Sequence, residues 1–162
     1  MPRTVVFLVI ALLGSGRFVA RGQQPATPAV FTSAQAEAGR MAFENSCAKC
    51  HTYSLLGRKG DEGEAPPLSS LTAPYLAFPG VSVPRVPALM GTAFVKKYGH
   101  WKVSAMYTLF RGAADTTPVS ELKMSDDTLV NITAYILQRN GAKPGNQPLT
   151  TTTDAAVSSI VE

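Results

Sequence analysis

Cys47 and Cys50 are the chain's only two cysteines, and His51 directly follows the second. Each thiol can add to a vinyl group of haem and leave a thioether bond, and the adjacent imidazole then lies under the iron as its proximal ligand. The spacing therefore predicts one haem c, attached covalently through Cys47 and Cys50, with His51 as a ligand of the iron.

The same residues could serve a structural disulfide, a thioredoxin-like redox pair or half of a zinc site. A redox pair follows a strand and uses a helix N-terminus to lower a thiol pKa, whereas the residues before Cys47 have a helical pattern. Zinc takes four protein ligands, and beyond this motif the chain has no cysteine and only His100. Covalent haem is the favoured interpretation, and a disulfide is the main alternative.

Residues 1–22 predict a secretory signal peptide, with Arg3, an apolar run from Thr4 to Leu13 and small residues around Ala20. The run is shorter than the roughly 20 residues of a membrane span, so we expect no stable span after cleavage. Covalent haem is attached outside the bacterial cytoplasm, and export agrees with that. We therefore expect a periplasmic or otherwise exported protein.

The charge balance excludes some function classes. The chain has 15 basic and 11 acidic residues, and loss of the three arginines in residues 1–22 leaves 12 basic residues, a net charge of +1. Nothing in this balance predicts nucleic acid as a partner. The sequence also lacks a Ser-His-Asp arrangement, a phosphate-binding glycine loop and a paired His-carboxylate pattern, so we expect no enzyme active site.

Three amphipathic segments predict three main helices, and no alternating segment requires a sheet. Thr32 or Ser33 is expected to cap the first helix, with Gln35 completing a capping box. Ser125 is expected to cap the third, which ends at Asn140-Gly141. The helices are expected at about residues 34–46, 103–111 and 126–139, with a shorter turn at 93–98.

Composition divides the chain into four parts. After the signal peptide we expect a linker at 23–32, a helical domain at 33–141 and a tail at 142–162. The tail contains two prolines and a run of threonines, so we expect it to be loosely ordered. The alternative is a tail that folds back through its apolar residues, which are Leu149, Val157, Ile160 and Val161.

The segment from Gly39 to Phe43 has a Gly-x-x-x-aromatic pattern just before Cys47, and Tyr135 lies within the third helical segment. In these features residues 33–141 resemble the class I c-type cytochromes, in particular the bacterial periplasmic mono-haem domains. The resemblance implies a small all-α fold, with three main helices around one covalently attached haem. It also implies that Gly39 lets the first helix cross the third closely, and it places Tyr135 among the cofactor-binding residues.

The resemblance implies an electron carrier rather than an enzyme, with redox partner proteins such as a periplasmic dehydrogenase or oxidase. It further implies that a proline carbonyl in Pro-x-Leu accepts a hydrogen bond from His51. The pattern occurs at Pro66-Pro67-Leu68 and at Pro87-Ala88-Leu89. We favour Pro87, because the residues that follow it are more similar to the family.

The sixth ligand of the iron departs from the family pattern. Family members place a methionine between the second and third helices, but the segment from Gly112 to Pro118 has none. Met124 is the favoured candidate, and His100, another methionine or an open site are alternatives. An open site would bind carbon monoxide or nitric oxide, and the protein would then be a haem sensor or small-ligand-binding protein.

Overall fold

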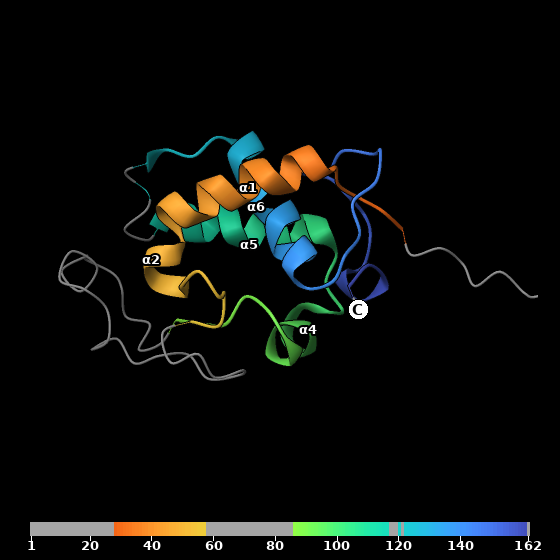
Figure 1. Ribbon diagram of the computed structural model, residues 1–162, viewed down its shortest axis with the longest axis horizontal. Helices are drawn as coiled ribbons and strands as arrows, with labels where there is room; N and C mark the ends of the chain where they lie inside the picture. Colours follow the sequence, from red (N-terminus) through yellow and green to blue (C-terminus); the bar gives the residue numbers. More distant parts are fainter. Residues whose placement is uncertain (1–27, 58–85, 117–119, 121, 162) are drawn as a thin grey trace, which may run out of the picture.

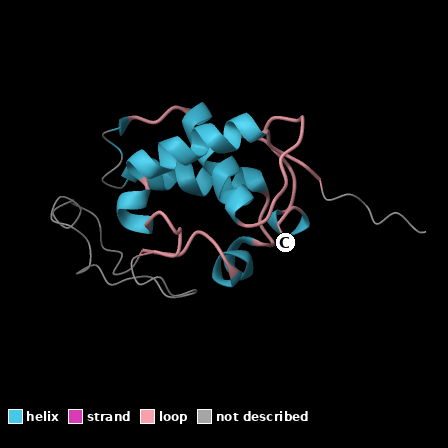
Figure 2. Cartoon of the chain, viewed as in Figure 1, coloured by secondary structure: helices cyan, strands magenta, loops and turns pink. Residues whose placement is uncertain are grey.

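The computed structural model describes residues 28–57, 86–116, 120 and 122–161, and within these residues the chain forms helices and no strand (Figure 2). The expected all-α fold is confirmed. The signal peptide, the first five linker residues and the Pro66-Pro67-Leu68 alternative lie outside the described residues. In chain order the elements are α1 (Ser33–Ser46), α2 (Ala48–His51), α4 (Thr92–Tyr98), α5 (Val103–Thr116), α6 (Asp126–Arg139) and the 3₁₀ helix η3 (Val157–Ser159).

Local capping explains where the two long crossing helices begin. The Thr32 hydroxyl accepts a hydrogen bond from the backbone N–H of Gln35, whose side chain in turn accepts from the N–H of Thr32. At α6 the Ser125 hydroxyl accepts from the N–H of Thr128. Both caps satisfy backbone donors that the first turn of a helix leaves unpaired, and both were predicted.

Helix α1 crosses α6 at a point where the two backbones nearly touch (Figure 1). A Cβ placed on Gly39 would lie only 1.8 Å from the carbonyl O of Asn131 in α6. Beside this crossing the rings of Phe43 and Tyr135 pack with their centroids 5.5 Å apart, and both side chains are buried. The predicted close crossing, with glycine at the contact and aromatic rings beside it, is confirmed.

The C-terminal tail differs from the loosely ordered segment that we expected. Leu149, Val157 and Ile160 are at most 2% exposed. The tail backbone pairs with the carbonyl of Trp101, just before α5, and with the N–H of Val103, the first residue of α5. Burial of these apolar side chains offsets the entropy lost by ordering the chain. The prolines and threonines of the tail favoured the prediction of a loosely ordered segment. Composition alone does not show that the spaced apolar residues pack on one surface.

The end of the expected linker also belongs to the folded domain. Phe31 is fully buried in the core, and its carbonyl accepts a hydrogen bond from the N–H of Gly145 at 2.8 Å. The side chain of Gln35 bonds to both the carbonyl and the N–H of Leu149. The N-terminal entry to α1 and the tail therefore hold each other in place, and the folded unit extends beyond 33–141 on both sides. No helix in the described part of the chain is long and apolar enough to span a membrane.

Candidate functional site

The two cysteines and the histidine lie on a single turn of helix directly after α1. Cys47 ends α1 and begins α2, and its carbonyl accepts hydrogen bonds from the N–H of Cys50 at 3.1 Å and of His51 at 2.9 Å. Both cysteines are in the thiol form and half-buried. Since α1 is fixed by its crossing with α6, this turn holds three chemically competent side chains at one defined place.

The environment of Cys47 does not suit a thioredoxin-like redox pair. Burial raises the pKa of the Cys47 thiol, and a hydrogen bond with the Ser46 hydroxyl opposes this only in part. A redox-active cysteine requires the opposite shift, because the thiolate is the nucleophile. Within the described residues there is also no group of three or more His, Cys, Asp or Glu side chains that could hold a bare metal ion. The raised pKa of the Cys47 thiol thus disfavours the redox alternative.

His51 is held by the carbonyl of Pro87, which lies 2.9 Å from the ring Nδ1. Burial lowers the pKa of His51 to about 4, and the hydrogen bond to Pro87 opposes this shift. The imidazole is therefore neutral at pH 7. Because a carbonyl only accepts, its single proton lies on Nδ1, and Nε2 keeps the lone pair that a metal ion can bind.

The segment carrying Pro87 is fixed against the residues that follow His51. The N–H of Leu89 donates to the carbonyl of Leu55 at 2.7 Å, and both leucine side chains are buried. Leu55 and Thr52 adopt positive φ angles of 63° and 62°, a conformation that costs free energy for residues other than glycine. The structure thus brings Pro87 to His51 as expected and uses a constrained turn to do so.

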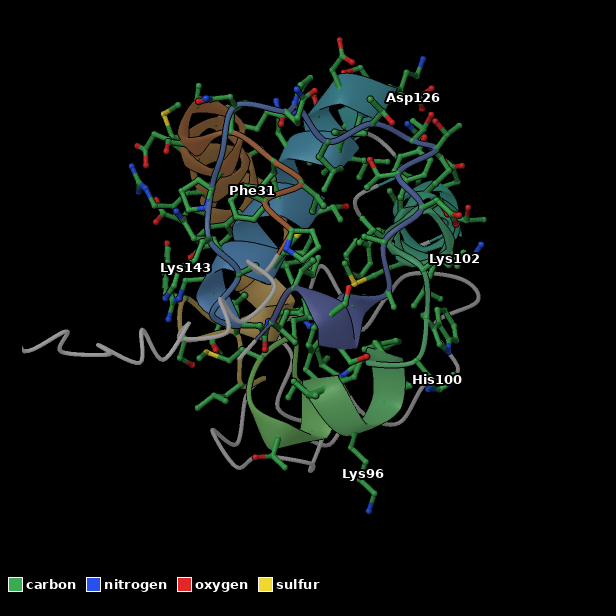
Figure 3. All side chains as sticks on the ribbon, turned by 90° about the vertical axis from the view of Figure 1, so that its right-hand side faces the viewer. Phe31, Lys96, His100, Lys102, Asp126 and Lys143 are labelled. Carbon is green, nitrogen blue, oxygen red and sulfur yellow. The ribbon has the colours of Figure 1, made fainter. Side chains whose placement is uncertain are left out.

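The candidates for a sixth ligand lie in different places. Met124 is half-buried against the core just before the Ser125 cap, and its carbonyl accepts a hydrogen bond from Arg111 at 2.9 Å. His100 is exposed and packs edge-on against Trp101. Figure 3 shows Asp126, two residues after Met124, near the top of the molecule and His100 in its lower part.

Two other methionines are engaged in the protein interior or with a charged neighbour. Met106 is fully buried in the hydrophobic core, and the Sδ of Met90 accepts a long hydrogen bond of 3.8 Å from Arg139. The segment from Gly112 to Pro118 is where the family pattern places a methionine. Its last two residues, Thr117 and Pro118, lie outside the described residues. The proximal side thus has a defined geometry, while Met124, His100, Met90 and Met106 each make contacts of their own.

Asn140 has a role that was not predicted from the sequence, where it was expected only to end the third helix. The side chain of Asn140 is buried and bonds to the backbone of Leu89 and Gly91. No local pattern could have revealed partners about 50 positions away in the chain.

Comparison with models of known protein families finds a match. A family model described as Cytochrome c matches residues 36–140, a range that begins in α1 and ends at the last residue capping α6. The matched range contains Cys47, Cys50, His51, Pro87 and Tyr135. Neither the search of curated proteins nor the search of solved structures found a match.

Proposed function

The chain belongs to the cytochrome c family, whose members are typically haem-based electron carriers, and from this we propose that it is an exported mono-haem c-type cytochrome that carries single electrons. One observation supports this most strongly. His51 lies on the same turn as Cys47 and Cys50, and its Nδ1 is hydrogen-bonded to the carbonyl of the distant Pro87. When bound, haem supplies a one-electron ferrous–ferric couple.

Each residue of the site has a distinct part in this proposal. Cys47 and Cys50 provide the two thioether attachments, and His51 binds the iron through Nε2. The carbonyl of Pro87 accepts the Nδ1 proton and so fixes both the tautomer and the orientation of the ring. Tyr135 packs on Phe43 beside the helix crossing and keeps α1, and with it the attachment turn, in place.

The cellular setting is part of the same proposal. The signal-like residues 1–22 and the requirement for haem attachment outside the bacterial cytoplasm support a periplasmic or otherwise exported location. The family implies redox partner proteins, and the proposed partners are a periplasmic dehydrogenase or oxidase.

Intact mass of the denatured mature protein tests covalent attachment. We expect the mass of the polypeptide plus one haem, and the double variant Cys47→Ser/Cys50→Ser should lose this increment. Thr152→Ala, an exposed change in the tail, is the matched control and should keep it. A wild-type mass equal to that of the polypeptide alone would refute the proposal.

A second candidate function is a haem sensor or small-ligand-binding protein with an open sixth site. It is favoured by the absence of methionine between Gly112 and Pro118, where the family pattern places the sixth ligand. The optical spectrum of the reduced protein, recorded with and without carbon monoxide, distinguishes the two functions. A low-spin spectrum that carbon monoxide does not change supports the electron carrier, and Met124→Ala and His100→Ala, made separately, then identify which side chain is the ligand.

A further inference from the structure

Asn140 is a buried polar side chain that joins two distant parts of the fold. It is 7% exposed. Its Nδ2 donates to the carbonyl of Leu89 at 3.0 Å and to that of Ile136 at 2.8 Å, and its Oδ1 accepts from the N–H of Gly91 at 3.0 Å. The orientation of the amide is fixed by these partners, because Leu89 presents a carbonyl and Gly91 an N–H.

The end of α6 does not require this arrangement. Gly141, with φ of 93°, provides the left-handed residue that terminates the helix, and the N–H of Ala142 bonds back to the carbonyl of Leu137. A helix end of this kind satisfies its carbonyls through the backbone alone. The Asn140 side chain therefore makes one hydrogen bond within its own helix, to Ile136, and two to the separate segment from Leu89 to Gly91.

That segment is the one that holds the proximal histidine. Pro87, whose carbonyl binds the Nδ1 of His51, lies two residues before Leu89. Pro87 to Leu89 form no helix or strand, so tertiary contacts must set their backbone position. Within the described residues, the backbone of Leu89 is held from one side by Leu55 and from the other by Asn140.

We infer that Asn140 is a positioning residue for the proximal histidine: by clamping the backbone from Leu89 to Gly91, it aims the Pro87 carbonyl at His51. The inference rests on the proposed function, since it assumes that His51 binds haem iron. A hydrogen bond to the other ring nitrogen raises the basicity of a ligating imidazole. Loss of the clamp weakens that bond, makes His51 a poorer donor to the iron and thereby favours the reduced state.

Two readouts on the holoprotein test this role. Asn140→Leu removes all three side-chain hydrogen bonds without adding charge, and the reduction potential should rise relative to wild type. The His51 Nδ1–H proton, followed by NMR, should exchange with solvent about fivefold faster or more, as expected for the loss of roughly 1 kcal/mol of hydrogen-bond stabilisation. Thr133→Val is the matched control, because Thr133 is buried in α6 and bonds only within the helix to Leu129. It should change neither readout.

Asn140→Asp gives a second measurement if Asn140→Leu does not accumulate as folded protein. Aspartate keeps the shape and the acceptor for Gly91 but cannot donate to Leu89, so proton exchange at His51 should again accelerate. The positioning role would be overturned if the His51 Nδ1–H proton exchanged in Asn140→Asp at the wild-type rate. It would also be overturned if the reduction potential of Asn140→Leu equalled that of Thr133→Val. Either result would leave the proposed function intact. Absence of covalent haem from the wild-type protein would overturn both.

Discussion

One added methyl group at Gly39 should force α1 away from α6 and destabilise the protein. The Cβ of an alanine there would lie 1.8 Å from the carbonyl O of Asn131 and 2.3 Å from its carbonyl C. Ordinary van der Waals contact begins near 3.4 Å, so the helices would have to separate by about 1.6 Å at this point. Both clashing atoms belong to the main chain, and no side-chain rotation can relieve the overlap.

The size of the effect follows from two opposing contributions. Overpacking a close-packed interior costs about 1–3 kcal/mol and sometimes more, because the surrounding atoms have little room to move. Alanine is a better helix former than glycine by up to about 1 kcal/mol, which offsets part of this cost. For Gly39→Ala we therefore expect the free energy of unfolding to fall by about 2 kcal/mol and Tm by about 8 °C.

Gly112→Ala is the matched control, because it makes the same chemical change in the interior of α5. Among the described residues, no atom outside the adjoining turns of α5 lies within 4 Å of a Cβ built at Gly112, so only the helix-propensity gain applies, and stability should rise by about 0.5–1 kcal/mol. Guanidinium unfolding of the holoprotein, followed by far-ultraviolet circular dichroism, measures both variants. A Gly39→Ala protein as stable as wild type, or a Gly112→Ala protein destabilised equally, would refute the reasoning.

Three further predictions concern the tail, the start of α6 and the start of α1. Leu149→Ala should lower the free energy of unfolding by about 2–5 kcal/mol, because Leu149 is buried. Thr152→Ala, at an exposed position of the tail, should change it by less than about 0.5 kcal/mol. Equal unfolding midpoints of the two variants in denaturant would contradict a packed tail. A hydrogen bond from Tyr107 holds the pKa of Asp126 below its ordinary value, so Tyr107→Phe should raise that pKa in an NMR pH titration. As the solution is acidified, the variant should then lose the stabilisation by the Asp126 carboxylate at a higher pH than the wild type does. Thr32→Ala should cost about 1 kcal/mol in thermal unfolding and Thr32→Ser much less; the opposite order would exclude a capping role.

The parts of the fold that sequence predicts are those determined by neighbouring residues. Thr32 and Ser125 cap helices through bonds that span three positions. Gly39 and Tyr135 lie far apart in the chain, yet each is recognisable because its spacing within its own helix matches a family pattern. Residue types at short fixed intervals were therefore enough to predict the helices and the close crossing of the first and third.

The parts that sequence did not predict depend on contacts between distant segments. The tail packs because its apolar side chains meet the domain, and its main chain pairs with Val103 and Trp101, which lie about 50 positions earlier. Asn140 looks like an ordinary helix-ending residue until its partners at Leu89 and Gly91 are known. In both cases the favourable free energy comes from long-range burial and pairing, which local composition does not encode.

Helix α6 links the stability of the fold to the environment of His51, and the two can be separated experimentally. Gly39 meets α6 at Asn131, two to three turns before Asn140. Because unfolding would not break the proposed thioether bonds, a destabilised variant should keep its haem, and its reduction potential should report the surroundings of His51 in the molecules that remain folded. Gly39→Ala should thus lower the unfolding midpoint without shifting the potential, whereas Asn140→Leu should shift the potential whatever its midpoint. Equal potential shifts in the two variants would mean that α6 transmits its displacement to the iron site as a rigid body, and that the hydrogen bonds of Asn140 have no separate effect.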